Sequence, residues 1–119
     1  RWLGPLDDAG KQELLAGASA LLFPIRWDEP FGLVMTEALA CGTPVVATRR
    51  ASTPEVIRDG ITGWLCDPAE PDPDAFAAAI RRVPQLDRRQ CRLDVERRFG
   101  VEAIAAQLLA ALESLRTVV

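Results

Sequence analysis

The stretch that opens with Asp28-Glu29-Pro30 constrains the fold of this chain more than any other. An apolar run with helical spacing follows the proline and stops at Gly42, and a short β-type run comes next. Proline suits the first position of a helix because its missing N–H is no loss there, and an acidic residue before it can cap free amides. Glycine accommodates the left-handed backbone that ends a helix. The pattern therefore predicts a loop, a helix over about residues 31–41, a turn and a strand.

Apolar runs of strand length alternate with helical patterns along the rest of the chain. Residues 20–24 and 45–48 are such runs, and the first is unbroken, as expected of a strand covered on both faces. Strands that alternate with helices indicate a parallel sheet with helices on both sides. We therefore expect one α/β domain over residues 1–119, with a Rossmann-like parallel sheet and flanking helices.

The other expected elements follow from capping residues and helical spacing. Asp7 or Asp8 can cap a helix that runs to about Ala18 and buries Leu14 and Leu15. The remaining elements are the end of a strand over residues 1–3, a short helix over 54–58, a strand over 63–66, a polar turn over 68–73, helices over 74–83 and 86–99, and an amphipathic helix over 101–115.

The start of the helix over residues 31–41 offers a place for an anion. The amides of Phe31, Gly32 and Leu33 have no partner inside a helix, and Gly32 has no side chain that would keep a ligand away. Glu29 lies before this helix and Glu37 about one and a half turns into it. Two carboxylates can therefore flank a neutral polyol that carries a phosphate.

Two loops are expected to face one crevice at the carboxyl ends of the strands, where ligands bind in open α/β sheets. One loop follows Phe23 and leads to Glu29, and the other follows Ala47. The cations of these loops fit either phosphate attraction or ordinary exposed charge. They are Arg26, Arg49 and Arg50.

Composition and charge argue against several functions. The formal net charge of -3 does not suit a nucleic-acid binder, which needs a basic surface. No apolar run approaches the roughly 18 residues that span a bilayer. Histidine is absent, and Cys41, Cys66 and Cys91 lack the spacing of metal ligands, so we expect reduced thiols in a cytoplasmic protein and no metal site. The arginine-rich region over residues 81–98 favours solvated helix faces with local ion pairs over contact with anionic lipid.

Two blocks of the sequence resemble a known family. Glu29 and Glu37, with seven residues between them, are set in Glu-Pro-Phe-Gly-Leu-Val and followed by Glu-Ala-Leu-Ala-Cys-Gly-Thr-Pro-Val-Val-Ala. This block looks like the donor-site signature of the group 1 (family four) retaining glycosyltransferases. The run from Ser52 to Leu65 resembles the next block of that family. The spacing of the two glutamates is a weak signal, and the ordered occurrence of both blocks carries the resemblance.

The resemblance implies a C-terminal donor-binding domain of the two-domain GT-B architecture. It implies that Glu29 orients the transferred sugar and helps to stabilise the transition state, and that Glu37 binds the ribose hydroxyls. It also implies a retaining reaction with a nucleotide-diphosphate sugar as donor, no cofactor and no bound metal. The backbone amides that match the phosphate-holding positions of the family are those of Phe31, Gly32, Leu33 and Val34.

Departures from the family pattern limit what this chain is expected to do alone. Ala51 stands where the family usually has glycine, and alanine would be strained if the position needs a positive φ. The family's basic pair for the diphosphate lies upstream of Arg1, and its N-terminal acceptor domain is absent from this chain. We therefore expect weak donor binding and no turnover by the chain alone. An exposed sheet edge would allow a dimer to form. The arginine-rich region over residues 81–98 would allow peripheral contact with a membrane.

Two alternatives remain open at this point. One is a non-catalytic nucleotide-binding or interaction module of the same fold, for which Ala51 is the hint. The other is a different GT-B enzyme, either an epimerase that relies on histidines or a phosphorylase with a lysine-bound cofactor. The chain has no histidine, and we expect its single lysine, Lys11, to lie on the first helix away from the crevice.

Overall fold

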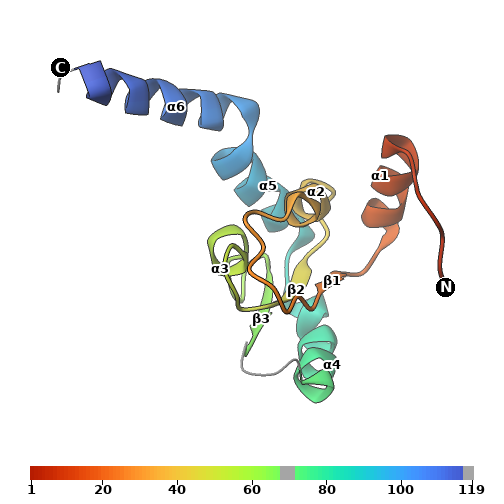
Figure 1. The fold of residues 1–119 in the computed structure, drawn as a ribbon. Coiled ribbons are helices and arrows are strands. Elements are labelled where there is room, and N and C mark those ends of the chain that lie inside the picture. Colours follow the sequence, from red (N-terminus) through yellow and green to blue (C-terminus); the bar gives the residue numbers. More distant parts are fainter. Residues whose placement is uncertain (68–71, 117–119) are drawn as a thin grey trace.

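The described residues form a parallel sheet of three strands in the order β1-β2-β3 (Figure 1). In the parallel pairs, Leu21 lies opposite Val45, and Val45 lies opposite Gly63. The computed structural model describes residues 1–67 and 72–116, and the predicted polar turn over residues 68–73 falls largely outside them. The strands are β1 (Leu21–Phe23), β2 (Val45–Thr48) and β3 (Gly63–Cys66).

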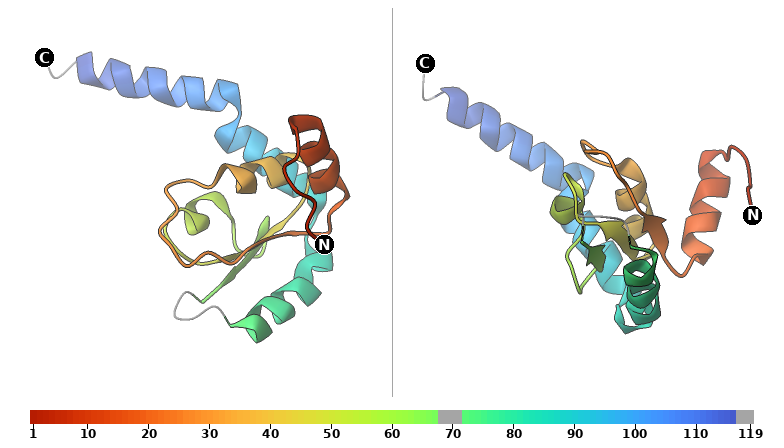
Figure 2. Two further views of the ribbon diagram at one scale, coloured as in Figure 1. Left: turned by 45° about the vertical axis from the view of Figure 1, so that its right-hand side comes forward. Right: turned by 60° about the horizontal axis from the view of Figure 1, so that its bottom comes forward.

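Helices cover both faces of the sheet, as the alternating pattern predicts. On one face, Met35 and Leu39 of α2 pack with Val45, and α5 closes the same core with Val95. On the other face, Phe76 of α4 packs against the opposite side of β2. The helices are α1 (Asp8–Gly17), α2 (Leu33–Ala40), α3 (Thr53–Val56), α4 (Pro73–Arg82), the 3-10 turn η1 (Val83–Gln85), α5 (Arg88–Phe99) and α6 (Val101–Arg116). Figure 2 shows α4 across the sheet from α5. The predicted α/β class is confirmed.

The start of α2 differs from the prediction. The helix begins at Leu33 with Gly32 as its N-cap, and no side chain caps it. Pro30 therefore precedes the helix and does not occupy its first position. Gly32 has a φ of 80°, and a Cβ at this position would lie 2.8 Å from Cε of Met35. Both the left-handed backbone and the close packing require glycine here, which moves the start of the helix beyond residue 31.

The first helix and strand confirm some sequence expectations and correct others. Asp7 caps α1 by accepting a hydrogen bond from the amide of Gly10 at 2.8 Å. Leu15 is buried as expected, but the prediction for Leu14 is wrong, because its side chain is 47% exposed. The expectation that β1 is covered on both faces is also wrong, since β1 is an edge strand and its Leu22 is exposed.

The predicted end of a strand over residues 1–3 is also wrong. These residues adopt no regular structure, and Trp2 is 89% exposed. A strand forms only where its backbone groups find a neighbouring strand, and the described chain offers none at this position.

Three arginines of α5 bind the carboxyl ends of three other helices. Each guanidinium donates to carbonyls that a helix end leaves without partners, and its charge opposes the negative end of the helix dipole. The acceptors are the carbonyls of Ala16 and Ala18 for Arg88, of Ala40 for Arg92, and of Glu55 and Val56 for Arg98. The predicted local ion pairs also form, from Arg92 to Glu96 and from Arg98 to Asp94. The basic segment is therefore a set of ties between helices as well as a solvated face.

The helix α6 extends away from the sheet (Figures 1 and 2). Its helical periodicity is confirmed, but none of its residues is buried. Leu108, Leu112 and Leu115 are each about 60% exposed, and no described element covers them. Within the described residues, no helix combines the length and apolarity needed to cross a membrane.

Candidate functional site

The loops that follow β1 and β2 meet at the carboxyl end of the sheet. Nε of Arg50, in the second loop, lies 2.8 Å from Oδ1 of Asp28, in the first loop. The expectation that both loops face one crevice came from the sheet topology, and this contact agrees with it. Both side chains are exposed, so the pair stabilises the fold by at most about 1 kcal/mol.

Glu29 lies against the turn that leads into α2. Its Oε2 accepts a hydrogen bond from Nε1 of Trp27 at 3.0 Å. Its Cγ would lie 3.4 Å from a Cβ placed on Gly32, so the glutamate and the glycine turn are neighbours. Among the described residues, Oε1 of Glu29 has no hydrogen-bond donor. This oxygen is available to accept a hydrogen bond from a hydroxyl of a ligand.

The amides at the start of α2 are free to bind an anion. Within the described residues, the N–H groups of Phe31, Gly32, Leu33 and Val34 donate to no protein acceptor. The two-residue shift of the helix start places Phe31 and Gly32 in the turn, and Leu33 and Val34 in the first turn of the helix. The positive end of the helix dipole lies at the same point. Free amides and dipole together favour a negatively charged ligand.

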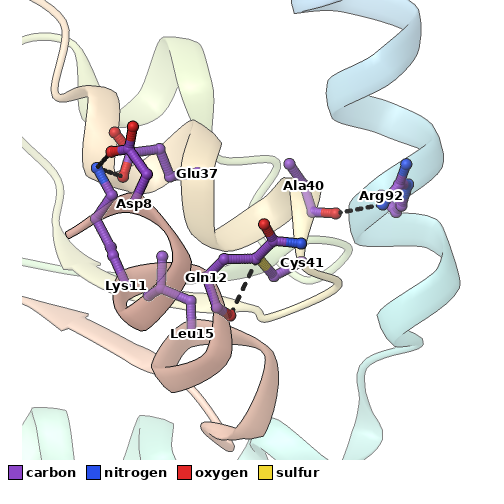
Figure 3. Close-up of a pocket in the computed structure, with 8 residues that line it drawn as sticks. All are labelled: Asp8, Lys11, Gln12, Leu15, Glu37, Ala40, Cys41 and Arg92. Carbon is purple, nitrogen blue, oxygen red and sulfur yellow. Dashed lines mark hydrogen bonds and ion pairs between the residues drawn. The ribbon is translucent and has the colours of Figure 1, made fainter. Parts of the chain in front are cut away.

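Glu37 faces α1 and forms an ion pair with Lys11 (Figure 3). Nζ of Lys11 lies 3.0 Å from Oε2 of Glu37 and 3.7 Å from Oδ1 of Asp8. A hydrogen bond and the charge of Glu37 raise the pKa of Lys11, which therefore stays protonated. Lys11 lies on the first helix as expected, but it pairs with a candidate site residue, so its position no longer argues against a lysine-dependent enzyme.

In the part of the chain that the structure describes, Glu37 lines two hollows. The first, of about 390 Å³, lies between α1 and α2. Its lining residues, drawn in Figure 3, are Asp8, Lys11, Gln12, Leu15, Glu37, Ala40, Cys41 and Arg92. The second, of about 660 Å³, runs from Phe31 and Leu33 toward α5 and α6. Glu29 lines neither of them. Glu37 is thus accessible from both sides of α2, while Glu29 belongs to the loop in front of the helix.

The structure separates the three arginines of the loops. Nη2 of Arg49 pairs with Oδ2 of Asp59 at 2.9 Å, next to β3. Arg26 lines a hollow with residues of α4, on the other side of the sheet from α2. Arg26 belongs to the loop that carries Glu29. Of the two arginines in the other loop, Arg50 pairs with that loop through Asp28, whereas Arg49 pairs with Asp59.

The loop after β2 is held by one buried side chain. Oγ1 of Thr53 accepts a hydrogen bond from the amide of Arg50 and donates to the carbonyl of Thr48. Ala51 has a φ of 49°, so the position does require the left-handed backbone that favours glycine. The condition under which alanine is strained is therefore met in the structure.

Two buried hydroxyls in this loop escaped the sequence reasoning. The side chains of Thr48 and Ser52 are at most 4% exposed, and their hydroxyls have no partner among the described residues. Buried polar groups are normally satisfied, so these two hydroxyls still have hydrogen-bonding capacity at the end of the strand. The sequence signal is only a hydroxyl residue at each end of the loop, which is common in turns.

Metal ligands and reactive thiols are not features of the described site. No group of three or more His, Cys, Asp or Glu side chains in residues 1–67 and 72–116 is placed to hold a metal ion. All three cysteines are free thiols. Burial raises the pKa of Cys91 to about 11, and burial also raises the pKa of Cys66. Both thiols are therefore protonated and inert at neutral pH.

Comparison with known proteins decides the family. The model of the family described as glycosyl transferases group 1 matches residues 1–98. The chain belongs to this family. It is 33% identical over 120 residues to phosphatidyl-myo-inositol mannosyltransferase of Mycobacterium leprae, covering 98% of this chain and 32% of the relative. It is 47% identical over 110 residues to N-acetyl-alpha-D-glucosaminyl L-malate synthase of Bacillus anthracis, covering 89% of this chain and 28% of the relative.

Solved structures of similar proteins agree with the fold of this group 1 chain. Anabaena Alr3699/HepE in complex with UDP superposes with a TM-score of 0.71 at 28% identity, covering 86% of this chain and 29% of that one. The same protein in complex with UDP-glucose superposes with a TM-score of 0.69. The predicted GT-B resemblance is confirmed. The chain spans about a third of the length of the relatives that it matches.

Proposed function

We propose that this chain is the donor-binding domain of a retaining glycosyltransferase, which moves a sugar from a nucleotide-diphosphate sugar to an acceptor. The observation that carries the proposal is the arrangement at α2. Unpartnered amides lie at its start beside Glu29, and Glu37 follows on its second turn. The UDP and UDP-glucose complexes of the similar Anabaena protein support a uridine nucleotide as donor.

The proposed chemistry follows from these groups. The amides of Phe31, Gly32, Leu33 and Val34 bind the distal phosphate. As the bond to the sugar breaks, negative charge develops on the leaving diphosphate and is met by fixed dipoles. We therefore propose a reaction without a bound metal or cofactor. Glu29 accepts hydrogen bonds from the hydroxyls of the transferred sugar and orients it, which makes it the proposed catalytic residue.

Glu37 is proposed to bind the ribose hydroxyls. Its carboxylate is oriented by the ion pair with Lys11, 3.0 Å away, and it borders two open hollows. A ribose diol can donate two hydrogen bonds to one carboxylate. The proposed contact therefore requires no rearrangement of α2.

The chain is proposed to supply half of an active site. The acceptor domain and the basic pair expected upstream would complete it, as the coverage of the relatives suggests. We accordingly propose weak donor binding and no turnover by residues 1–119. The free thiols support a cytoplasmic location. A dimer through the sheet edge at β1, or contact of the arginine-rich region over residues 81–98 with a membrane surface, is a secondary proposal.

A calorimetric titration tests the proposal. We would titrate UDP, GDP, ADP and their sugar conjugates into the unsubstituted chain, Glu37→Ala and Glu29→Gln. One nucleotide family should bind, and Glu37→Ala should weaken both the nucleotide and its sugar conjugate about tenfold, near 1.4 kcal/mol. Glu29→Gln should weaken the sugar conjugate more than the free nucleotide. Glu113→Ala, on the exposed face of α6, removes the same charge and should change neither.

Two results would count against the proposal. Failure of every nucleotide to bind would contradict a donor site in this chain. Sugar transfer by the chain alone would contradict the half-site. Binding of nucleotide with no discrimination by Glu29→Gln would favour the second candidate, a non-catalytic nucleotide-binding module, which the strained backbone at Ala51 supports.

A further inference from the structure

Arg50 carries an incompletely used guanidinium at the carboxyl end of β2. It contacts Asp28 through Nε alone, at 2.8 Å. Within the described residues its two Nη groups have no partner. Guanidinium groups bind carboxylates and phosphates most strongly through two parallel hydrogen bonds. The observed contact therefore leaves both Nη groups of Arg50 able to bind another anion through two parallel hydrogen bonds.

The backbone of Arg50 is fixed, so only its side chain has to move. Its amide donates to Oγ1 of Thr53 at 2.9 Å, and its carbonyl accepts from the amide of Thr53 at 3.1 Å. Thr53 is fully buried. Movement of the guanidinium away from Asp28 breaks one exposed ion pair and no other hydrogen bond of the side chain.

The ion pair places Arg50 against the loop that leads to the free amides. Asp28 is the residue before Glu29, and Glu29 packs against the Gly32 turn. The neighbouring cation is differently engaged, because Arg49 pairs with Asp59. The second oxygen of Asp59 accepts a hydrogen bond from the amide of Leu65 in β3, which holds this pair in place.

We propose that the diphosphate of the donor displaces Asp28 from Arg50, and that Arg50 then binds a phosphate oxygen together with the amides at the start of α2. This inference rests on the proposed function and names one residue of the phosphate site. Asp28 pairs with Arg50 when no donor is bound. Its carboxylate competes with the donor, so the two members of the pair have opposite effects on affinity.

Binding of UDP measured by calorimetry tests this assignment on the 119-residue chain. Arg50→Gln should weaken binding about five- to tenfold, because a charge-assisted bond to phosphate is lost. Asp28→Asn should tighten binding about two- to threefold, since an exposed ion pair is weak. Arg49→Gln removes the same charge one residue away and should change the affinity less than about twofold. With UMP in place of UDP, the loss in Arg50→Gln should be smaller.

The double variant separates competition from general charge. In the Arg50→Gln background, Asp28→Asn should no longer tighten binding, because Asp28 acts through Arg50. If the pair only ties two loops together, both single variants weaken binding by similar factors, and the inference fails. Equal losses in Arg49→Gln and Arg50→Gln would also overturn it. Both results leave the proposed function intact, whereas absence of UDP binding by the unsubstituted chain removes both.

Discussion

Replacing Ala51 by glycine should stabilise the fold. Ala51 is an exposed residue with a φ of 49°, and a Cβ in this backbone region costs roughly 1–2 kcal/mol. Glycine avoids that cost but makes the unfolded chain more flexible, which offsets about 0.4–1 kcal/mol. The expected net gain in the free energy of unfolding is about 0.5–1 kcal/mol. At an unfolding entropy of about 2.1 cal/mol/K per residue, this raises Tm by about 2–4 °C.

Urea and thermal unfolding followed by circular dichroism measure this change. Ala78→Gly, at an exposed position in the middle of α4, is the matched control and should lose about 0.5–1 kcal/mol. Ala51→Val adds a β-branched side chain in the left-handed region and should also lower stability. The same substitution to glycine is therefore expected to have opposite signs at residues 51 and 78.

A loss of stability in Ala51→Gly as large as that in Ala78→Gly would refute the reasoning. It would mean that the backbone at residue 51 is not left-handed in solution. Measuring the affinity of Ala51→Gly for the donor gives a second test. If strain in this loop reshapes the sugar end of the site, relief of the strain should change the affinity for the sugar conjugate and not for the free nucleotide.

Three further outcomes follow from the described contacts. Thr53→Val should lower the free energy of unfolding by about 1–3 kcal/mol in urea, because the partly buried amide of Arg50 loses its acceptor and the carbonyl of Thr48 loses its donor. Arg98→Met should cost about 2–3 kcal/mol and speed hydrogen exchange in α3, since two carbonyls at the end of that helix and Asp94 lose a donor. The pKa of Cys91 is near 9 in the unfolded chain and about 11 in the folded protein, so the unfolded state loses this proton first as pH rises. The free energy of unfolding should therefore fall by about 2 kcal/mol between about pH 9 and pH 11. Cys91→Ala should reduce this decline, which urea unfolding at several pH values measures.

The helix-turn-strand block around Glu37 was predictable because local chemistry decides it. The helix α2 ends just before Gly42, and β2 begins with the β-branched residues that follow. Both boundaries lie within one residue of the expected positions. The start of α2 was not predictable to the same precision. Proline is compatible both with the first helical position and with the turn before a helix. The left-handed backbone of Gly32 and its packing against Met35 decide that the helix begins after Pro30. The local preferences of proline do not predict this packing.

The errors and omissions concern contacts between distant segments. Leu14 and Leu22 are apolar residues of the kind that is usually buried. Their exposure depends on which elements pack against α1 and against the edge strand β1. The pairing of Lys11 with Glu37 joins residues 26 positions apart, and Arg88 reaches carbonyls 70 and 72 positions away. Spacing within a helix predicts local ion pairs, and it carries no signal for these ties.

The position of the free amides in the candidate site is a consequence of how α2 is held at its other end. Met35, Ala38 and Leu39 are completely buried, and Arg92 of α5 binds the carbonyl of Ala40 at the end of the helix. A helix fixed by its core face and its carboxyl end presents its first turn in one orientation. Dipoles that are already oriented need no reorganisation when charge develops on a bound phosphate. The exposed side chains of the loops, such as Arg50, are held by fewer contacts. In the proposed donor site, a rigid helix end would therefore act together with an exposed cation.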